Sequence, residues 1–222
     1  MSNYKVNNPN NPIDYILVGG GGHCHSCINS IVKSGHNVIG IIDGYIEGDI
    51  LGFPVIGCDD DIPQLMIEHP NAEFIVTVGM IKGTSALRQK LYENLVINNA
   101  VKNSTVSSCA AVSPFAKIGV GSIVLEGAAI NANAFIGENV IVNTGAIIEH
   151  DAYVGSHSHV STGAIVNGGV KVGENCMIGS GAIILQAIEI VANTTIAAGS
   201  VVTKNITIAG TWVGIPAIRK DK

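Results

Sequence analysis

The chain has 222 residues, of which 47% are hydrophobic but only 5% aromatic, while 27 are glycine, so Val, Ile and Ala must fill its core. The net charge of −5 excludes binding of nucleic acid through the phosphate backbone, which needs clustered Lys and Arg. No run of about 18 uncharged apolar residues occurs, so we expect no membrane insertion, and the odd cysteine count of five indicates reduced thiols in the cytoplasm.

Residues 1–12 are polar and lack the apolar core of a signal peptide, so we expect a disordered lead on a chain that is not exported. Residues 13–99 alternate short apolar runs with segments of helical period, which predicts a small α/β domain with a parallel, Rossmann-like sheet of four or five strands. We expect strands at 15–18, 38–42, 55–56 and 74–78, and helices at 24–34, 62–68 (capped by Asp59 or Asp60) and 85–94.

Four glycines, Gly19 to Gly22, follow the first expected strand and precede the first expected helix. This arrangement favours phosphate, because the backbone can approach an anion closely and the helix N-terminus offers unpaired N–H groups. Cys24 stands where a dinucleotide fingerprint has its third glycine or alanine, so a tight structural turn is the alternative. Asp43 ends the next strand, where it could contact a nucleoside or cap the amides of a turn.

The run from His23 to Cys27 contains two histidines and a Cys-x-x-Cys spacing, which zinc and redox sites also use. No second pair of ligands follows nearby. We therefore expect the polar start of a helix and no metal.

From Val106 onward every sixth residue is Val or Ile for eighteen hexads. Because six is even, the marked side chains all face one way along extended chain, and nearby Gly and Asn permit one bend per hexad. The pattern predicts a parallel β-helix over residues 106–213, after a linker at 100–105 and before a C-terminal tail at 214–222. The marked residues are Val106, Val112, Ile118, Val124, Ile130, Ile136, Val142, Ile148, Val154, Val160, Val166, Val172, Ile178, Ile184, Ile190, Ile196, Val202 and Ile208.

Charged and catalytic residue types are sparse in this half, so the cluster from Glu149 to His159 is a candidate site. His150 comes two residues after the inward Ile148, and Asp151 could orient its imidazole. A structural histidine is the alternative. A metal site of the β-helical carbonic anhydrase kind is disfavoured, because every histidine of the repeat half lies between positions 150 and 159.

Several motifs together resemble the bacterial nucleotide-4-amino-sugar N-acetyltransferases and the related sialic acid O-acetyltransferases. They are the GGGH turn at 20–23, VNTGAIIEHD at 142–151, SHVS at 158–161 with Gly163 and Gly168, the hexads, and GIPA at 214–217. The resemblance extends from Tyr15 to Lys220. One departure concerns Asp151, because the family commonly has Glu directly after its histidine.

The resemblance implies a left-handed β-helix with three hexads per coil, and a homotrimer whose active sites lie between subunits. It implies acetyl-CoA along the groove between adjacent β-helices and a nucleotide sugar held by the N-terminal domain. By position it assigns the catalytic base to His150 with Asp151 beside it, substrate contacts to Asn143 and His159, and the acetyl-CoA contact to Gly168. It likewise assigns the diphosphate to Gly20, Gly21, Gly22 and His23, and the nucleoside to Asp43.

The expected reaction is acetyl transfer from acetyl-CoA to the 4-amino group of a UDP- or dTDP-linked amino-dideoxy-sugar in bacterial surface-glycan biosynthesis. His150 acts as general base, without a covalent enzyme intermediate. O-acetylation of a sialic or another nonulosonic acid is the first alternative. A non-catalytic trimeric scaffold is the second.

Overall fold

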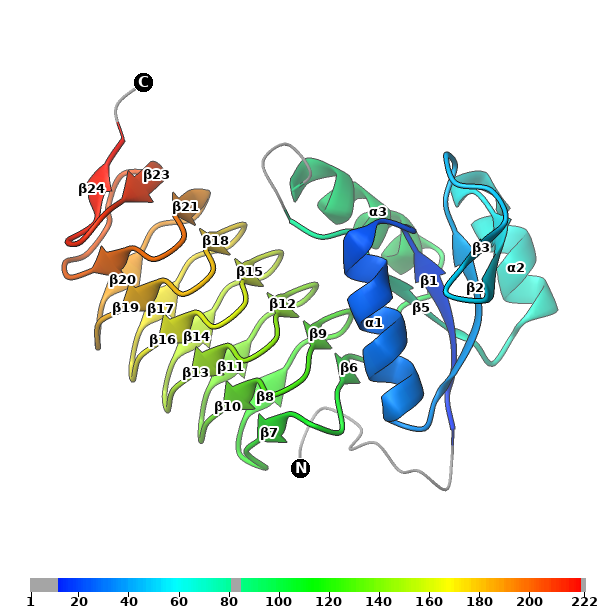
Figure 1. Ribbon diagram of the computed structural model, residues 1–222, viewed down its shortest axis with the longest axis horizontal. Helices are drawn as coiled ribbons and strands as arrows, with labels where there is room; N and C mark the ends of the chain where they lie inside the picture. The colour runs from blue at the N-terminus through cyan, green and yellow to red at the C-terminus, as the bar shows by residue number, and fades with distance from the viewer. Residues whose placement is uncertain (1–11, 81–84, 221–222) are drawn as a thin grey trace.

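The computed structural model describes residues 12–80 and 85–220, in which an α/β domain is followed by a stack of β-helical coils (Figure 1). The expected lead at 1–12 lies outside these ranges except for Pro12. In the two ranges, no helix is both long and apolar enough to cross a bilayer.

The N-terminal domain is built on a five-stranded sheet of order β3-β4-β2-β1-β5. All neighbouring strands pair in parallel except β3, which runs antiparallel to β4 at the edge. The predicted parallel sheet is therefore confirmed, with one short edge strand that the sequence analysis did not predict. The strands are β1 (Asp14–Val18), β2 (Asn37–Ile42), β3 (Asp49–Ile50), β4 (Phe53–Gly57) and β5 (Glu73–Val76).

Helices cover both faces of this sheet. They are α1 (Gly22–Lys33), the 3-10 helix η1 (Asp59–Asp61), α2 (Ile62–Glu68) and α3 (Ser85–Ile97). Apolar side chains of α1 pack on one face together with Ile123 and Leu125 of the β-helix, so the two parts of the chain share a core. Side chains of α2 and α3 fill the other face. Capping by Asp59 or Asp60 was wrong, because both belong to η1 and the N-cap of α2 is Asp61, without a side-chain cap.

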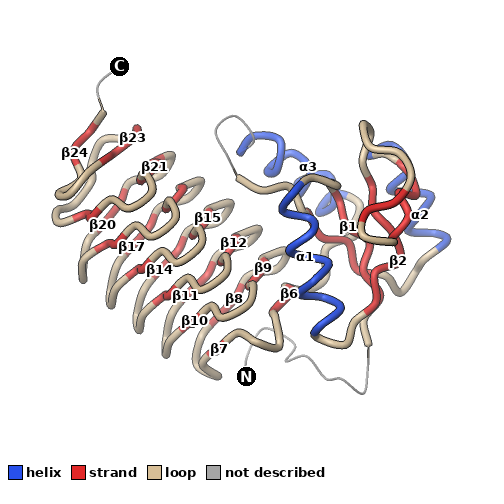
Figure 2. Tube along the Cα trace, in the orientation of Figure 1, coloured by secondary structure: helices blue, strands red, loops and turns tan. Residues whose placement is uncertain are grey.

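The C-terminal part is a left-handed β-helix in which each strand pairs in parallel with the strand eighteen residues later, as Ala111 does with Ala129 and Ala129 with Ile147. Its turns are therefore stacked one above another (Figure 2). Seventeen strands, β6 through β22, follow the hexads, and the marked Val and Ile side chains as far as Val202 form one continuous core with inward alanines. Burial of such side chains is worth about 1.5–3 kcal/mol each, which explains how a core with few aromatics holds together.

The coils have three faces, each made by every third strand. The domain face consists of β6 (Thr105–Val106), β9 (Ile123–Val124), β12 (Ile141–Val142), β15 (His159–Val160), β18 (Met177–Ile178) and β21 (Thr194–Ile196). The apolar face consists of β7 (Ala111–Val112), β10 (Ala129–Ile130), β13 (Ile147–Ile148), β16 (Ile165–Val166), β19 (Ile183–Ile184) and β22 (Val201–Val202). The mixed face consists of β8 (Lys117–Ile118), β11 (Phe135–Ile136), β14 (Tyr153–Val154), β17 (Lys171–Val172) and β20 (Glu189–Ile190).

The outward side chains give each face its character. On the domain face Ile123, Ile141 and His159 are buried. The mixed face carries the stacked rings of Phe135 and Tyr153 between lysines and a glutamate. Every outward side chain of the apolar face is Ala, Ile or Val.

The last hexad departs from the prediction. Ile208 is 55% exposed, and Ile206 fills the inward position instead, forming a bridge with Ile190. The reason is that the chain after Val202 reaches the next core position two residues earlier than the repeat requires. The chain then forms β23 (Gly210–Val213) and turns back antiparallel as β24 (Ile218–Arg219), so the expected tail supplies part of the end of the stack.

Candidate active site

His150 lies in the turn between β13 and β14, where the apolar face meets the mixed face; we call this corner the His150 edge. Coil-to-coil hydrogen bonds fix the turn, since the Asp151 N–H donates to the Ala132 carbonyl at 3.1 Å and the Gly169 N–H to the His150 carbonyl at 3.0 Å. The imidazole itself is exposed. The backbone thus presents His150 outward on a rigid frame.

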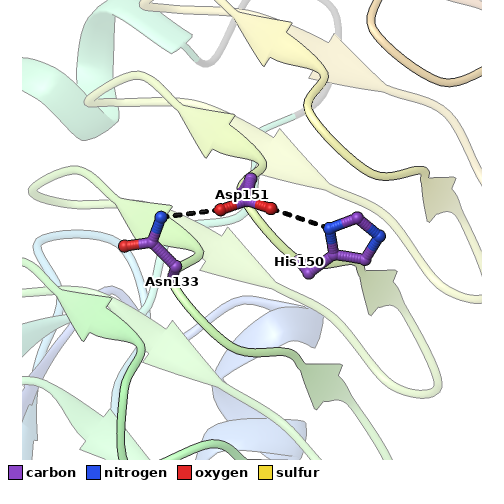
Figure 3. Close-up of polar contacts among 3 residues, drawn as sticks. All are labelled: Asn133, His150 and Asp151. Atoms are coloured by element: carbon purple, nitrogen blue, oxygen red, sulfur yellow. Dashed lines mark hydrogen bonds and ion pairs between the residues drawn. The ribbon is translucent and has the colours of Figure 1, made fainter.

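Asp151 is hydrogen-bonded to the His150 ring, and its Oδ2 lies 2.8 Å from Nδ1 of His150 (Figure 3). Because a carboxylate can only accept, Nδ1 carries the hydrogen and Nε2 keeps its lone pair. The hydrogen bond to Asp151 raises the pKa of His150, and the charges of Asp151 and Glu149 act in the same direction. The pKa of Asp151 is lowered by the Asn133 amide and by His150. The pair is therefore a base with a fixed tautomer and a carboxylate that stays ionised.

Gly168 lies directly against this ring, in the next coil toward the C-terminus, which we call the coil above. A Cβ at Gly168 would fall 2.8 Å from both Cε1 and Nε2 of His150, so only glycine leaves room for the imidazole. Among the described residues, no acceptor bonds the Gly168 amide. The expected neighbours His150, Asp151 and Gly168 are thus brought together at one edge.

Asn143 and His159 form a second pair at the corner between the domain face and the apolar face; we call it the His159 edge. The Asn143 Oδ1 accepts the Thr144 N–H at 2.8 Å, which places the amide Nδ2 3.2 Å from Nε2 of His159. Nε2 must then be the acceptor, so the hydrogen is on Nδ1, which donates to the Met80 carbonyl at 3.3 Å. The lone pair of His159 is therefore engaged, and Asn143 keeps one N–H to offer.

His159 is only 6% exposed, and burial lowers its pKa to about 4, with the positive charge of Arg88 acting in the same direction. Arg88 of α3 is itself buried, and its Nη1 donates to the carbonyls of Val76 and Val78 at 2.7 and 2.8 Å. It thereby ties α3 to the chain that leads from β5 to Met80. The two histidines differ accordingly: His159 is a neutral, buried donor, whereas His150 is an exposed base.

The glycine turn divides into two parts. Gly20 is buried, its N–H donates to Asp43 Oδ2 at 2.7 Å, and a Cβ there would meet Ile50 at 2.6 Å. Asp43 Oδ1 accepts the amides of Tyr45 and Ile46, so this carboxylate caps a turn. Gly21 and Gly22 are exposed at the start of α1, and their N–H groups have no partner among the described residues.

His23 connects this turn with the His159 edge. Its ring centroid is 6.3 Å from that of His159, and burial lowers its pKa to about 3, with Arg88 and His159 contributing in the same direction. His23 is therefore neutral. The neighbouring thiols are buried, which raises the pKa of Cys24 to about 11. Within residues 12–80 and 85–220, no group of three His, Cys, Asp or Glu side chains could hold a metal ion.

The two edges lie apart within one chain. Asn143 precedes β13 and His150 follows it, so the two residues flank this strand from opposite ends. The structure thus joins the glycine turn with Asn143 and His159, and joins His150 with Asp151 and Gly168, but the apolar face separates these two groups.

The sequence analysis did not identify Asn133, whose amide Nδ2 donates to Asp151 Oδ1 at 2.7 Å (Figure 3). A signal was present, because Asn133 precedes Asp151 by one coil of eighteen residues. No sequence signal distinguished Arg88 or the Met80 carbonyl, since both act through the packing of α3 and of residues 77–80 near the β-helix.

Comparisons with known proteins agree with this architecture. Residues 14–95 match the PglD N-terminal domain family, and residues 169–204 match the bacterial transferase hexapeptide family of six repeats. A comparison with curated protein sequences gave no match.

Solved structures similar to the chain include PerB from Caulobacter crescentus in complex with CoA and GDP-perosamine. It is 33% identical, with a TM-score of 0.87, and the match covers 94% of this chain and 97% of that one. The acetyltransferase domain of PglB from Neisseria gonorrhoeae in complex with acetyl coenzyme A is 28% identical, with a TM-score of 0.86 and coverage of 95% and 100%. WeeI from Acinetobacter baumannii, at 22% identity and a TM-score of 0.81, shares the fold.

The level of identity and the nearly complete coverage extend to both parts of the chain, so the shared features are more than a common β-helix. The chain belongs to the hexapeptide-repeat family of nucleotide-amino-sugar N-acetyltransferases, and it is an acetyltransferase that uses acetyl-CoA as donor.

Proposed function

We propose that the chain acetylates the 4-amino group of a nucleotide-linked amino-dideoxy-sugar in bacterial surface-glycan biosynthesis, with His150 as general base. The observation that carries this proposal is the fixed tautomer of His150, whose Nδ1–H is held by Asp151 while Nε2 stays available over Gly168. A base of imidazole strength suits an amine nucleophile at neutral pH. PerB, which was solved with GDP-perosamine, supports a nucleotide sugar as acceptor.

The reaction needs no covalent enzyme intermediate. The amine nitrogen attacks the thioester carbonyl of acetyl-CoA while Nε2 of His150 takes a proton from it. The C–N bond forms and the C–S bond breaks, and the CoA thiolate recovers the proton from the imidazolium directly or through water. The unpaired amide of Gly168 is the candidate donor to the oxyanion that develops on the carbonyl.

The acceptor is assigned to the His159 edge and the glycine turn. The exposed Gly21 and Gly22 amides at the start of α1 suit the diphosphate, and the remaining N–H of Asn143 suits an oxygen of the sugar. His23 and His159 are neutral, and their neighbouring rings connect the glycine turn with the His159 edge. Asp43 uses both oxygens for turn amides, so any contact with the nucleoside is made by a carboxylate that is already fixed.

The same geometry supports a homotrimer with shared sites. The first coils of the domain face pack against the chain's own N-terminal domain, and the mixed face is partly charged, which leaves the apolar face for another copy. Packing three such faces around an axis places the His150 edge of one subunit beside the His159 edge of the next. Each site would then be complete only between chains. The expected location is the cytoplasm, where acetyl-CoA is made.

The acceptor is tested by CoA release from acetyl-CoA with a panel of amino-sugar nucleotides carrying UDP, dTDP or GDP, and with free and CMP-linked sialic acids. We expect turnover with a nucleotide-linked 4-amino sugar and none with its 4-hydroxy counterpart. Turnover with the sialic acids alone would replace the proposal by O-acetylation. Calorimetry with acetyl-CoA serves as the control, because the donor must bind in either case.

A further inference from the structure

The Asp151 carboxylate is held from two sides, and each of its oxygens has one partner. Oδ1 accepts the Asn133 amide at 2.7 Å, and Oδ2 accepts the His150 Nδ1–H at 2.8 Å (Figure 3). Asn133 lies in the turn between β10 and β11, one coil below. The flanking strands pair in register, which stacks the two turns directly. Asn133, Asp151 and His150 therefore form one continuous chain of hydrogen bonds.

The backbone does not account for the choice of asparagine at this position. Asn133 and Asp151 have left-handed φ angles of 61° and 59°, a conformation that Asn and Asp tolerate. In the next two coils the equivalent turn positions, each eighteen residues further along the same column of stacked turns, are Gly169 and Ala187, with φ angles of 66° and 57°. Neither residue has a polar side chain, so the turn forms without one. The amide of Asn133 adds a contact that the turn does not require.

We propose that Asn133 is a positioning residue, whose amide turns the Asp151 carboxylate so that its second oxygen holds Nδ1 of His150 and Nε2 faces the reacting atoms. The proposal rests on the assignment of His150 as base. It also explains how the shorter Asp can stand where the family commonly has Glu. The short Asp151 side chain on an exposed turn could adopt other rotamers that face solvent. The hydrogen bond from Asn133 selects the rotamer whose carboxylate reaches the imidazole.

The charges around the ring are few. The turn below contributes Asn131, Ala132 and Asn133, and the turn above contributes Asn167, Gly168 and Gly169, none of which is charged. Glu149 and Asp151 on the ring's own turn raise the pKa of His150, and the hydrogen bond that the ring donates to Asp151 is the largest cause. A change in the Asp151 rotamer is therefore expected to lower the pKa of His150.

The test is a double-mutant cycle with Asn133→Gly and Asp151→Ala, read as kcat/KM against pH. Glycine suits the left-handed turn, and Ala187 in the same column shows that the turn also accommodates alanine. We expect Asn133→Gly to reduce kcat/KM about tenfold, the value of one hydrogen bond to a charged group, and to move the acid limb to lower pH. In the Asp151→Ala background the same change should have no further effect, because Asn133 acts only through Asp151.

The matched control is Asn175→Gly, which removes a similar 2.7 Å contact between coils, from Asn175 Nδ2 to Asn193 Oδ1, at another corner. We expect it to leave the pH profile unchanged. The proposal would be overturned if the losses in kcat/KM from Asn133→Gly and Asp151→Ala multiplied in the double variant. It would also be overturned if Asn133→Gly left the acid limb of the pH profile where it is in the wild type. A His150→Ala variant with wild-type turnover would instead refute the assignment of the base, so the two failures are distinguishable.

Discussion

At the scale of single residues, Asp151 is the position where the sequence analysis expects a departure from the family pattern. The structure places its Oδ2 2.8 Å from His150 Nδ1, so the shorter side chain still makes the contact. The backbone there is left-handed, with φ of 59°, which suits aspartate better than a longer acid. The sequence predicted which two residues act together, but the third partner became evident only when the coils were stacked.

The Asp151–His150 pair predicts a specific dependence on pH. Because the hydrogen bond to Asp151 raises the pKa of His150, the wild-type acid limb of kcat/KM should lie above the ordinary histidine value of about 6.5. Below the raised pKa the imidazole is protonated and cannot accept a proton, so activity falls as the pH falls through it. Asp151→Ala should move this limb to lower pH and also lower the plateau, since the tautomer is no longer held.

Glu149→Gln is the control for this measurement, because Glu149 raises the pKa of His150 by charge alone and less than Asp151 does. It should shift the acid limb less and leave the plateau unchanged. If the limb of Asp151→Ala coincided with that of the wild type, the carboxylate would have no part in setting the base.

The different environments of the two candidate histidines could not be predicted from the residues around them. His150 and His159 lie nine residues apart, and neither Glu149 and Asp151 beside the first nor Ser158 and Val160 beside the second indicate which ring is buried. Their environments differ because β15 lies on the domain face, where the N-terminal domain buries His159, whereas the turn after β13 is exposed. That difference arises from the packing of Met80 and Arg88, residues far away in the chain.

At the scale of elements, hexad spacing was sufficient to place every strand from β6 to β22, because the same side-chain position repeats in each. The last hexad failed because spacing alone does not show where a repeat ends, and Ile206 reached the core before Ile208 could. In the N-terminal domain, α2 was predicted with its observed bounds. The short β3 was missed because two residues carry no periodicity.

The turn above His150 gives a prediction at this scale. Gly168→Ala should reduce kcat/KM at least tenfold with little change in the melting temperature, because the new Cβ would lie 2.8 Å from the imidazole and must displace it. The displaced group is the end of a flexible side chain, so the cost falls on the position of the base rather than on folding.

Gly199→Ala provides the comparison. Its φ of 66° makes alanine strained by about 1 kcal/mol, but no atom lies within 4 Å of the added Cβ. It should lower the melting temperature and leave turnover unchanged. Full activity in Gly168→Ala would mean that the His150 imidazole does not act from its observed position against Gly168.

At the scale of the whole molecule, one chain carries two candidate groups, the His150 edge and the His159 edge, on either side of its apolar face. The sequence supplied the members of both, since each motif is local. The residue pattern alone did not show that the two groups lie apart. Asn143 and His150 are close in sequence, but they lie at opposite ends of β13. A trimer around the apolar face would bring complementary halves together.

The shared site is tested by mixing two defective variants in one trimer. His150→Ala should lose about 10²–10⁴-fold in rate as the trimeric enzyme, the usual contribution of a general base. Asn143→Ala should be impaired at the other edge. Co-expressed in equal amounts, the two should recover about a quarter of wild-type activity, because random mixing pairs an intact His150 edge with an intact His159 edge in about a quarter of sites.

Co-expression of His150→Ala with Asp151→Ala is the control, because both changes damage the same edge and no site can be intact. The decisive measurement is CoA release by the mixed His150→Ala and Asn143→Ala trimers, with acetyl-CoA and the preferred nucleotide sugar. Recovery of about a quarter of wild-type activity is the result expected for halves joined between subunits. Mixed trimers that form but recover no activity above the separate variants would contradict it.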